Sequence, residues 1–167
     1  MPEPDLNVLH FEFTNRDELY RQIVAAPNFL KTIVDINRSS GTTTNFNREQ
    51  LYEFLTSSFK NGGSIFLLSL GKTPIGFSIG YHNTRIKKEF TLSYVAITKE
   101  HQRKGFGEFF LKKVYRKLES LGYIQISMFE NNGAMSQINK KITRSKKYEL
   151  EKKGSTIIKI LKSKRPL

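Results

Sequence analysis

The chain has 167 residues, 38% of them hydrophobic, and a formal net charge of +13 at neutral pH. This length is enough to bury a core and short enough for one domain, so we expect residues 1–167 to form a single domain. The absence of cysteine excludes disulfides and zinc–thiolate sites. No apolar stretch approaches the roughly 18 residues of a membrane span, and the N-terminus has no signal-like pattern, so we expect a cytoplasmic protein without a membrane partner.

The positive charge is concentrated in the second part of the chain. Residues 99–167 carry 18 Lys and Arg against 6 Asp and Glu, whereas residues 1–98 carry 10 against 9. This charge serves an anionic cofactor, faces an acidic partner such as nucleic acid, or forms a solvated surface, and we favour the solvated surface. Because no RNA-recognition or helix-turn-helix signature is present, we expect no specific nucleic-acid binding, only weak and salt-sensitive contacts.

The first part of the chain predicts one strand followed by helices. Thr14, with Asp17 three residues later, is the expected N-cap of the first helix, which ends at Pro27. Asn47 with Gln50 predicts a capped helix further on. In order, the expected elements are a strand over residues 6–13, the helix before Pro27, a helix over 29–36, a loop over 38–46, the helix that Asn47 caps, and strands over 64–70 and 75–81 joined as a hairpin.

The central stretch of the sequence is an apolar strand, a glycine turn and an amphipathic helix over residues 90–121. The strand reads Leu92-Ser93-Tyr94-Val95-Ala96-Ile97, and residues 86–89 are expected to pass straight into it. The turn reads Gln102-Arg103-Lys104-Gly105-Phe106-Gly107. Its glycines let a ligand approach the backbone, and the first N–H groups of the following helix favour an anion. Together with the charges of Arg103 and Lys104, this turn predicts a phosphate or pyrophosphate site.

Two common phosphate-binding motifs do not fit this turn. The dinucleotide fingerprint G-x-G-x-x-G requires a third glycine where Phe110 stands. A Walker A loop ending in Gly71-Lys72-Thr73 requires a glycine where Phe66 stands. The pattern Q-x-x-G-x-G after a strand that ends in Val95-Ala96-Ile97 resembles instead the GNAT superfamily of acyl-CoA-dependent N-acetyltransferases.

The order of elements in the rest of the chain agrees with that resemblance. Residues 123–129 predict a strand, with Ile124, Ile126 and Met128 on one face, that lies parallel to the 90–97 strand because a helix joins them. A short helix over residues 132–142 and a final hairpin of residues 147–150 with 156–161 follow. The resemblance therefore implies a mixed α/β (α+β) fold. Its central sheet has about six to seven strands, a central parallel β-α-β unit, and helices on both faces.

The resemblance also implies an enzyme and its cofactor. Acetyl-CoA is the expected cofactor, the residues from Gln102 to Gly107 are expected to hold its pyrophosphate, and Val95, Ala96 and Ile97 are expected to bind the pantetheine and the thioester oxygen. The segment from Asn132 to Asn139 resembles the family's N-x-x-[AM]-x-x-[LI]-[YN] motif, which adds both asparagines to the expected cofactor contacts. The expected acceptor is a primary amine of a small molecule or peptide, and a homodimer is an option.

The sequence identifies the proton-transfer residues less specifically than the cofactor contacts. Glu89, on the same face of its strand as Thr91, is the candidate base, with a solvated strand-end charge as the alternative. His82 is a second candidate base, and the three histidines have no metal-ligand spacing. Asn139 stands where the family often has a tyrosine acid, and since an amide is too weak an acid, it is expected to orient the sulfur. The proton for the sulfur is then expected from water, from the departing ammonium, or from a nearby residue such as Tyr148, which the motif does not place there.

A second function from another class is compatible with the same fold. The chain is either an acetyltransferase or a noncatalytic CoA-binding or basic nucleic-acid-binding module.

Overall fold

The structure is a computed structural model that describes residues 3–42, 45–129, 133–145 and 147–160. A seven-stranded mixed sheet in the order β1-β2-β3-β4-β5-β7-β6 forms its centre. In chain order the elements are β1 (Leu6–Phe13), α1 (Arg16–Ala25), α2 (Asn28–Ser39), α3 (Arg48–Ser58), β2 (Gly63–Leu70), β3 (Thr73–Asn83), β4 (Glu89–Ile97), a 3-10 turn (Lys99–His101), α4 (Phe106–Ser120), β5 (Gln125–Met128), α5 (Gly133–Thr143), β6 (Tyr148–Lys153) and β7 (Ser155–Ile160).

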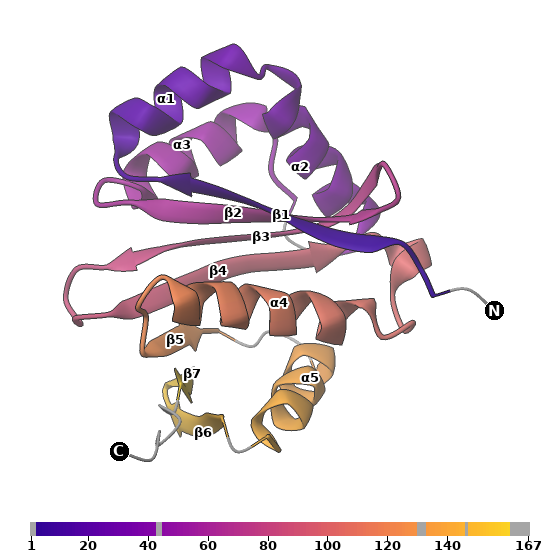
Figure 1. The fold of residues 1–167 in the computed structure, drawn as a ribbon. Coiled ribbons are helices and arrows are strands. Elements are labelled where there is room, and N and C mark those ends of the chain that lie inside the picture. The colour runs from indigo at the N-terminus through magenta and orange to yellow at the C-terminus, as the bar shows by residue number, and fades with distance from the viewer. Residues whose placement is uncertain (1–2, 43–44, 130–132, 146, 161–167) are drawn as a thin grey trace.

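The helices cover both faces of the sheet, as Figure 1 shows, with α1, α2 and α3 on one side and α4 and α5 on the other. Each face has its own apolar core. Leu19, Ile33 and Leu55 pack with Phe77 of β3 under the first three helices. Phe110 and Val114 of α4 pack on the opposite face. The predicted mixed α/β fold with helices on both faces is therefore confirmed.

The predicted parallel unit around the central helix is also present. β4 pairs with β5 in parallel, and α4 connects them. Gly122, with φ of 95°, lies just after the end of α4 in the left-handed conformation that glycine tolerates best. The remaining neighbours in the sheet are antiparallel, including the predicted hairpins β2–β3 and β6–β7.

The ends of several elements differ from the predictions. The N-cap of α1 is Asn15, whose side chain accepts a hydrogen bond from the Glu18 N–H, and not Thr14. Thr14 instead donates through its backbone N–H and its hydroxyl to the Glu18 carboxylate, so the reciprocal pattern is shifted by one residue. The helix after Pro27 continues to Ser39, where a loop was predicted, because Ile36 and Asn37 are buried on its inner face.

Two strands begin later in the structure than predicted. Residues 86–88 form a turn and do not belong to β4, and Lys88 has φ of 61°. Ile124 precedes β5 and is 41% exposed, so it does not share the buried face of Ile126 and Met128.

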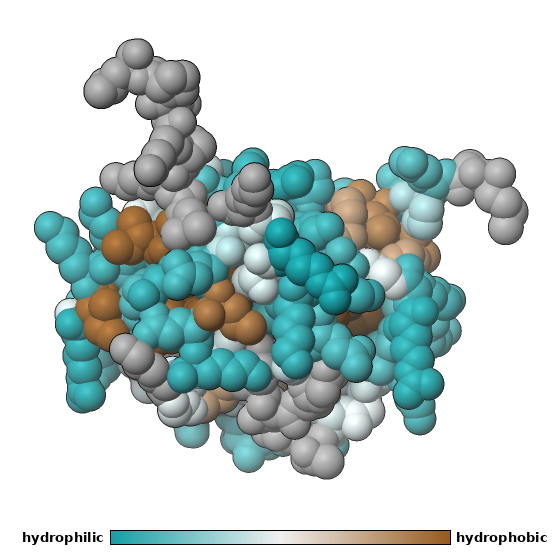
Figure 2. Space-filling view, turned by 90° about the horizontal axis from the view of Figure 1, so that it is seen from below, coloured by the Kyte–Doolittle hydropathy of each residue, from teal (hydrophilic) through white to brown (hydrophobic). Residues whose placement is uncertain are grey.

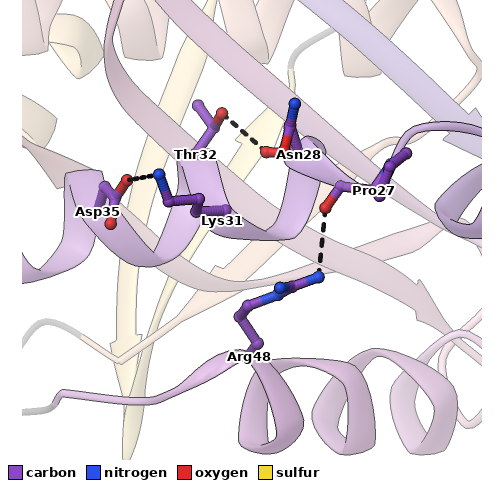
Figure 3. A network of polar contacts seen from close by, with 6 residues as sticks. All are labelled: Pro27, Asn28, Lys31, Thr32, Asp35 and Arg48. Carbon is purple, nitrogen blue, oxygen red and sulfur yellow. Dashed lines mark hydrogen bonds and ion pairs between the residues drawn. The ribbon is translucent and has the colours of Figure 1, made fainter.

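A hydrogen bond connects the N-terminal ends of α2 and α3. Figure 3 shows Arg48, the first residue of α3, donating to the carbonyl of Pro27, the N-cap of α2, at 3.4 Å. The predicted capping box of α3 is confirmed, because Asn47 and Gln50 bond reciprocally through side chain and backbone. These contacts fix the start of α3 relative to α2, and Phe54 of α3 contacts Tyr94 of β4.

No helix in the described part of the chain is both long and apolar enough to cross a membrane.

Candidate active site

The turn between β4 and α4 has the geometry that a phosphate requires. Gly105 is the N-cap of α4 with φ of 81°, and no side chain caps the helix. Arg103 also has a positive φ, 61°, and its side chain and that of Lys104 are exposed. A Cβ built on Gly105 would meet no atom of the described residues within 4 Å, so the space on that side of Gly105 is open. The first N–H groups of α4 therefore have no capping side chain among the described residues and directly follow two exposed cationic residues, an arrangement that suits an anion.

Two side chains of the turn hold it in place. Phe106 is buried, and its ring stacks on that of His101. The Gln102 amide donates to the carbonyls of Ser40 and Ile97, at 2.9 and 2.8 Å. Gln102 therefore ties the turn to the end of β4 and to the end of α2, so its side chain positions the loop.

Gly107 is the second residue of α4. A Cβ at this position would lie 3.1 Å from Cδ1 of Ile138 and 3.6 Å from Cδ1 of Ile97. The missing side chain at Gly107 therefore lets α5 pack closely against the start of α4.

β4 and β5 separate beside this turn. Their pairing ends at Leu92 and Met128, although β4 continues to Ile97. Among the described residues, no strand pairs with Ser93–Ile97 on the β5 side. The opposite edge stays paired with β3, but Ile79 faces Tyr94 and Gly80 faces Leu92, so Ser93 is an extra, bulged residue. The gap leaves the β5-facing edge of Val95, Ala96 and Ile97 without a strand partner among the described residues, close to the start of α4, and the Ile97 carbonyl on β4 accepts from Gln102.

Glu89 is neither solvated nor close to the gap. It is 2% exposed, and its carboxylate accepts hydrogen bonds from the amides of Asn83, at 2.7 Å, and of Gln125. The alternative of a solvated strand-end charge is therefore wrong. Glu89 precedes Ser93 by four residues, a distance of about 13 Å along a strand. The hydroxyls of Thr91 and Ser127, 3.2 Å apart, lie between Glu89 and the gap.

Asn139 of α5 lies at the gap. Its side chain is fully buried, accepts a hydrogen bond from the Tyr115 hydroxyl at 2.7 Å, and donates to the sulfur of Met128 at 3.2 Å. Met128 is the last paired residue of β5. Asn139 is therefore held against the point where the strands separate, on the α4 side of the sheet.

The other predicted site residues lie elsewhere or outside the description. Asn132 lies outside the described residues. Tyr148 packs against Tyr115, and burial, with a smaller contribution from Glu119, raises the pKa of its phenol above the ordinary value of 10.0. The raised pKa makes Tyr148 a poorer proton donor. His82 lies near the end of β3, in a hollow with Lys60 and Arg85.

A second hollow, which no sequence pattern predicts, lies next to the bulge. Its volume is about 220 Å³, and Asn45, Phe46, Gln50, Leu51, Phe54 and Tyr94 line it. Phe54 and Tyr94 have the spacing of ordinary core residues, and only the packing of α3 over β4 brings them together.

Residues 30–136, which include the turn, α4 and the gap, match the model of the Acetyltransferase (GNAT) family. The chain belongs to this family. GNAT proteins use acetyl-CoA as the acetyl donor, so this chain is an acyl-CoA-dependent N-acetyltransferase.

Solved structures of GNAT acetyltransferases share the fold over nearly the whole chain. The ribosomal-protein-S18-alanine N-acetyltransferase from Escherichia coli is 12% identical, with a TM-score of 0.61 over 95% of this chain and 100% of that one. Ard1 from Thermoplasma volcanium is 11% identical, with a TM-score of 0.64 over 95% and 99%. PaiA N-acetyltransferase from Thermoplasma acidophilum, solved with coenzyme A, is 12% identical, with a TM-score of 0.58 over 93% and 99%. No curated protein sequence matches the chain significantly.

Proposed function

We propose that this GNAT acetyltransferase transfers the acetyl group of acetyl-CoA directly to a primary amine, with the cofactor at the turn between β4 and α4. The observation that carries the proposal is the position of two features at one end of β4. The uncapped, positively charged start of α4 lies beside the gap between β4 and β5. A cofactor with an anionic pyrophosphate and a long amide-containing arm needs this combination.

In this proposal each part of the site has one task. The N–H groups of Phe106 and Gly107 bind the pyrophosphate, Arg103 and Lys104 add positive charge, and Gln102 and Gly105 shape the turn. The free edge of β4 over Val95, Ala96 and Ile97 offers backbone groups to the pantetheine amides and to the thioester oxygen. Asn132, by its place in the motif, adds a cofactor contact.

The bound cofactor supplies an acetyl thioester, and the transfer conserves atoms and electrons. The lone pair of the amine nitrogen forms a C–N bond to the acetyl carbon, and the C–S bond breaks. CoA leaves as a thiolate, and the proton that the nitrogen loses passes to the thiolate or to water. An N–H of the free β4 edge stabilises the charge that develops on the acetyl oxygen.

Two buried residues support this chemistry by positioning groups. We propose that Asn139, whose buried amide already bonds to Tyr115 and Met128, orients the cofactor sulfur by holding α5 at the gap. Glu89, fixed by Asn83 and Gln125, holds the start of the β4–β5 pair. Because its carboxylate already accepts two amide hydrogen bonds, we propose that it positions the strands and that water accepts the amine proton.

Thiol-detected release of CoA, with acetyl-CoA and a panel of primary amines, tests the proposal. We expect amine-dependent release, with the acetylated amine as product by mass spectrometry. Binding of acetyl-CoA without release for any amine or peptide would contradict direct transfer and would support the noncatalytic module. A cytoplasmic location, to be checked by fractionation, is part of the proposal.

A further inference from the structure

The hollow next to the bulge is lined by aromatic rings. Tyr94 of β4 contacts Phe54 of α3, with ring centroids 5.0 Å apart, and Phe46 of the loop before α3, at 5.5 Å. Both pairs are edge-to-face, with interplanar angles of 81° and 71°. The three rings are only half-buried, and the buried Leu51 completes the apolar lining. An apolar ligand group placed here would gain burial against rings that already hold a fixed geometry.

The hollow lies next to the proposed site of reaction. Tyr94 is the residue between the bulged Ser93 and Val95, whose backbone edge faces the gap. Consecutive Cα atoms are about 3.8 Å apart, so a group in the hollow lies within one or two residues of the free edge. Tyr94 belongs to the core under α1, α2 and α3, which places the hollow on the opposite face of the sheet from α4. An acceptor in the hollow would therefore approach the gap from the side opposite to the helix that holds the cofactor.

The chemistry of the lining excludes a charged ligand tail. None of the six lining residues is acidic or basic, and the polar ones are Asn45, Gln50 and the Tyr94 phenol. The side-chain oxygen of Gln50 accepts from the N–H of Asn47. A second ammonium or a carboxylate entering the hollow would lose hydration without gaining an ion pair.

A further aromatic side chain stands on the other side of the gap. Phe129 directly follows the last residue of β5 and is 76% exposed, the highest exposure of any large apolar side chain among the described residues. Aromatic side chains thus occur on both sides of the gap, on β4 and just beyond β5.

We propose that the acceptor is a primary amine whose nitrogen carries, one or two carbons away, an aromatic or branched apolar group that fills this hollow. This inference rests on the proposed function and names its substrate class. Two sources present the same chemistry: a small arylalkyl monoamine, and the N-terminus of a peptide that begins with an aromatic residue.

Steady-state CoA release with matched amines tests the inference and separates these sources. The panel contains 2-phenylethylamine, ethanolamine and putrescine, and two peptides that differ only in an N-terminal Phe or Asp. We expect kcat/KM for 2-phenylethylamine, or for the Phe peptide, to exceed that for the hydrophilic member by about tenfold or more, the scale on which apolar pockets discriminate. Preference for 2-phenylethylamine over the Phe peptide identifies a small amine, and the reverse identifies a peptide N-terminus.

Variants locate the effect in the hollow. Phe54→Ala should lower kcat/KM for the preferred aromatic acceptor about tenfold or more. It should lower the value for ethanolamine much less, because ethanolamine carries no apolar group for the hollow, and the thermal shift by acetyl-CoA should match that of the wild type. Tyr20→Ala, at a 55% exposed position on α1, is the control. It should change neither kcat/KM for the aromatic acceptor nor the thermal shift by acetyl-CoA.

Different results would overturn the inference alone or the inference together with the proposed function. Equal or better turnover of ethanolamine or putrescine would overturn the inference while upholding amine acetylation. Equal loss for all acceptors in Phe54→Ala would also overturn it. Release of CoA with no member of the panel would overturn both the inference and the proposed function.

Discussion

Two buried serines on adjacent strands differ in their hydrogen bonding. The hydroxyl of Ser64 on β2 pairs with Nε2 of His10 at 2.9 Å. The hydroxyl of Ser78 on β3, opposite Val95, has no hydrogen-bond partner among the described residues. A buried hydroxyl that has lost water without gaining a partner lowers the free energy of unfolding.

Removing these hydroxyls should therefore have opposite effects. We expect Ser78→Ala to raise the free energy of unfolding by about 1 kcal/mol and Ser64→Ala to lower it by about as much. Urea unfolding of both variants measures this. A loss of stability in both would show that the Ser78 hydroxyl has a partner.

The environment of His10 makes stability depend on pH. Burial lowers the pKa of its imidazole below the ordinary 6.5, Lys117 acts in the same direction, and Glu12 opposes them. Between the folded pKa and pH 6.5, the imidazole of His10 binds a proton in the unfolded chain but stays neutral in the folded chain. The contribution of His10 is therefore complete above about pH 6.5 and is lost as pH falls towards the folded pKa.

Comparison of wild type with His10→Gln isolates this contribution. Between pH 7.5 and 5.5, urea unfolding should show a larger loss of stability for the wild type than for the variant. Parallel pH dependence of the two proteins would contradict the assignment.

The burial and the hydrogen-bond partners of Glu89 could not be predicted from its sequence neighbours. Its neighbours Lys87 and Lys88 favour a solvated charge, and its place on the strand favours a base. Its burial between Asn83 and Gln125 depends on the pairing of β4 with β3 and β5, which no local pattern encodes. A sequence identifies the carboxylate, and only the sheet identifies its partners.

The variant Glu89→Gln distinguishes positioning from proton transfer. For a positioning residue we expect a loss of about 2 kcal/mol in stability, the scale of hydrogen bonds to a charged group, with the acidic limb of the kcat/KM profile at the same pH as in the wild type. Disappearance of that limb in the variant would restore Glu89 as the general base.

At the scale of elements, local patterns with a strict chemical signature predict the structure best. The capping box of α3, the glycine after α4 and the turn that starts α4 each depend on residues within a few positions of one another. The bulge at Ser93 and the hollow at Tyr94 depend on the register of β3 against β4 and on the docking of α3. The bulge and the hollow arise from tertiary packing, so the turn proposed for the cofactor was predictable from local sequence and the hollow proposed for the acceptor was not.

Asn139 joins three elements, because it links α5 to Tyr115 of α4 and to Met128 of β5. Replacement by alanine would take an acceptor from the buried Tyr115 hydroxyl. We expect Asn139→Ala to lower the free energy of unfolding by about 2 kcal/mol. We expect the rate of the folded enzyme to fall about tenfold, the scale of one lost hydrogen bond, with the alkaline limb of its pH profile unchanged.

Urea unfolding and pH–rate profiles of Asn139→Ala provide these values. A loss of about a thousandfold in rate, or an alkaline limb that a Tyr148→Phe variant abolishes, would instead reveal a dedicated side-chain acid.

At the scale of the whole molecule, the two ends of β4 differ in strand pairing. Its N-terminal end is fully paired and holds a buried carboxylate, and its C-terminal end is open on one side beside the start of α4. The face seen in Figure 2 is mostly hydrophilic with separate apolar patches, as expected of a solvated surface. Only the charges of Arg103 and Lys104 are assigned to the cofactor.

The central claim is that acetyl-CoA binds at the start of α4, and two glycines at opposite ends of that helix provide the test. Gly105 and Gly122 both have positive φ, 81° and 95°, and a Cβ on either would meet no atom within 4 Å. Asparagine tolerates this conformation, so Gly105→Asn and Gly122→Asn should fold with similar small costs.

The decisive measurement is calorimetric titration of acetyl-CoA into both variants and the wild type. We expect Gly105→Asn to weaken binding by about tenfold or more, because a side chain would occupy the space above the uncapped N–H groups, and Gly122→Asn to bind like the wild type. Wild-type affinity in Gly105→Asn, or equal weakening in both variants, would contradict a cofactor site at this turn.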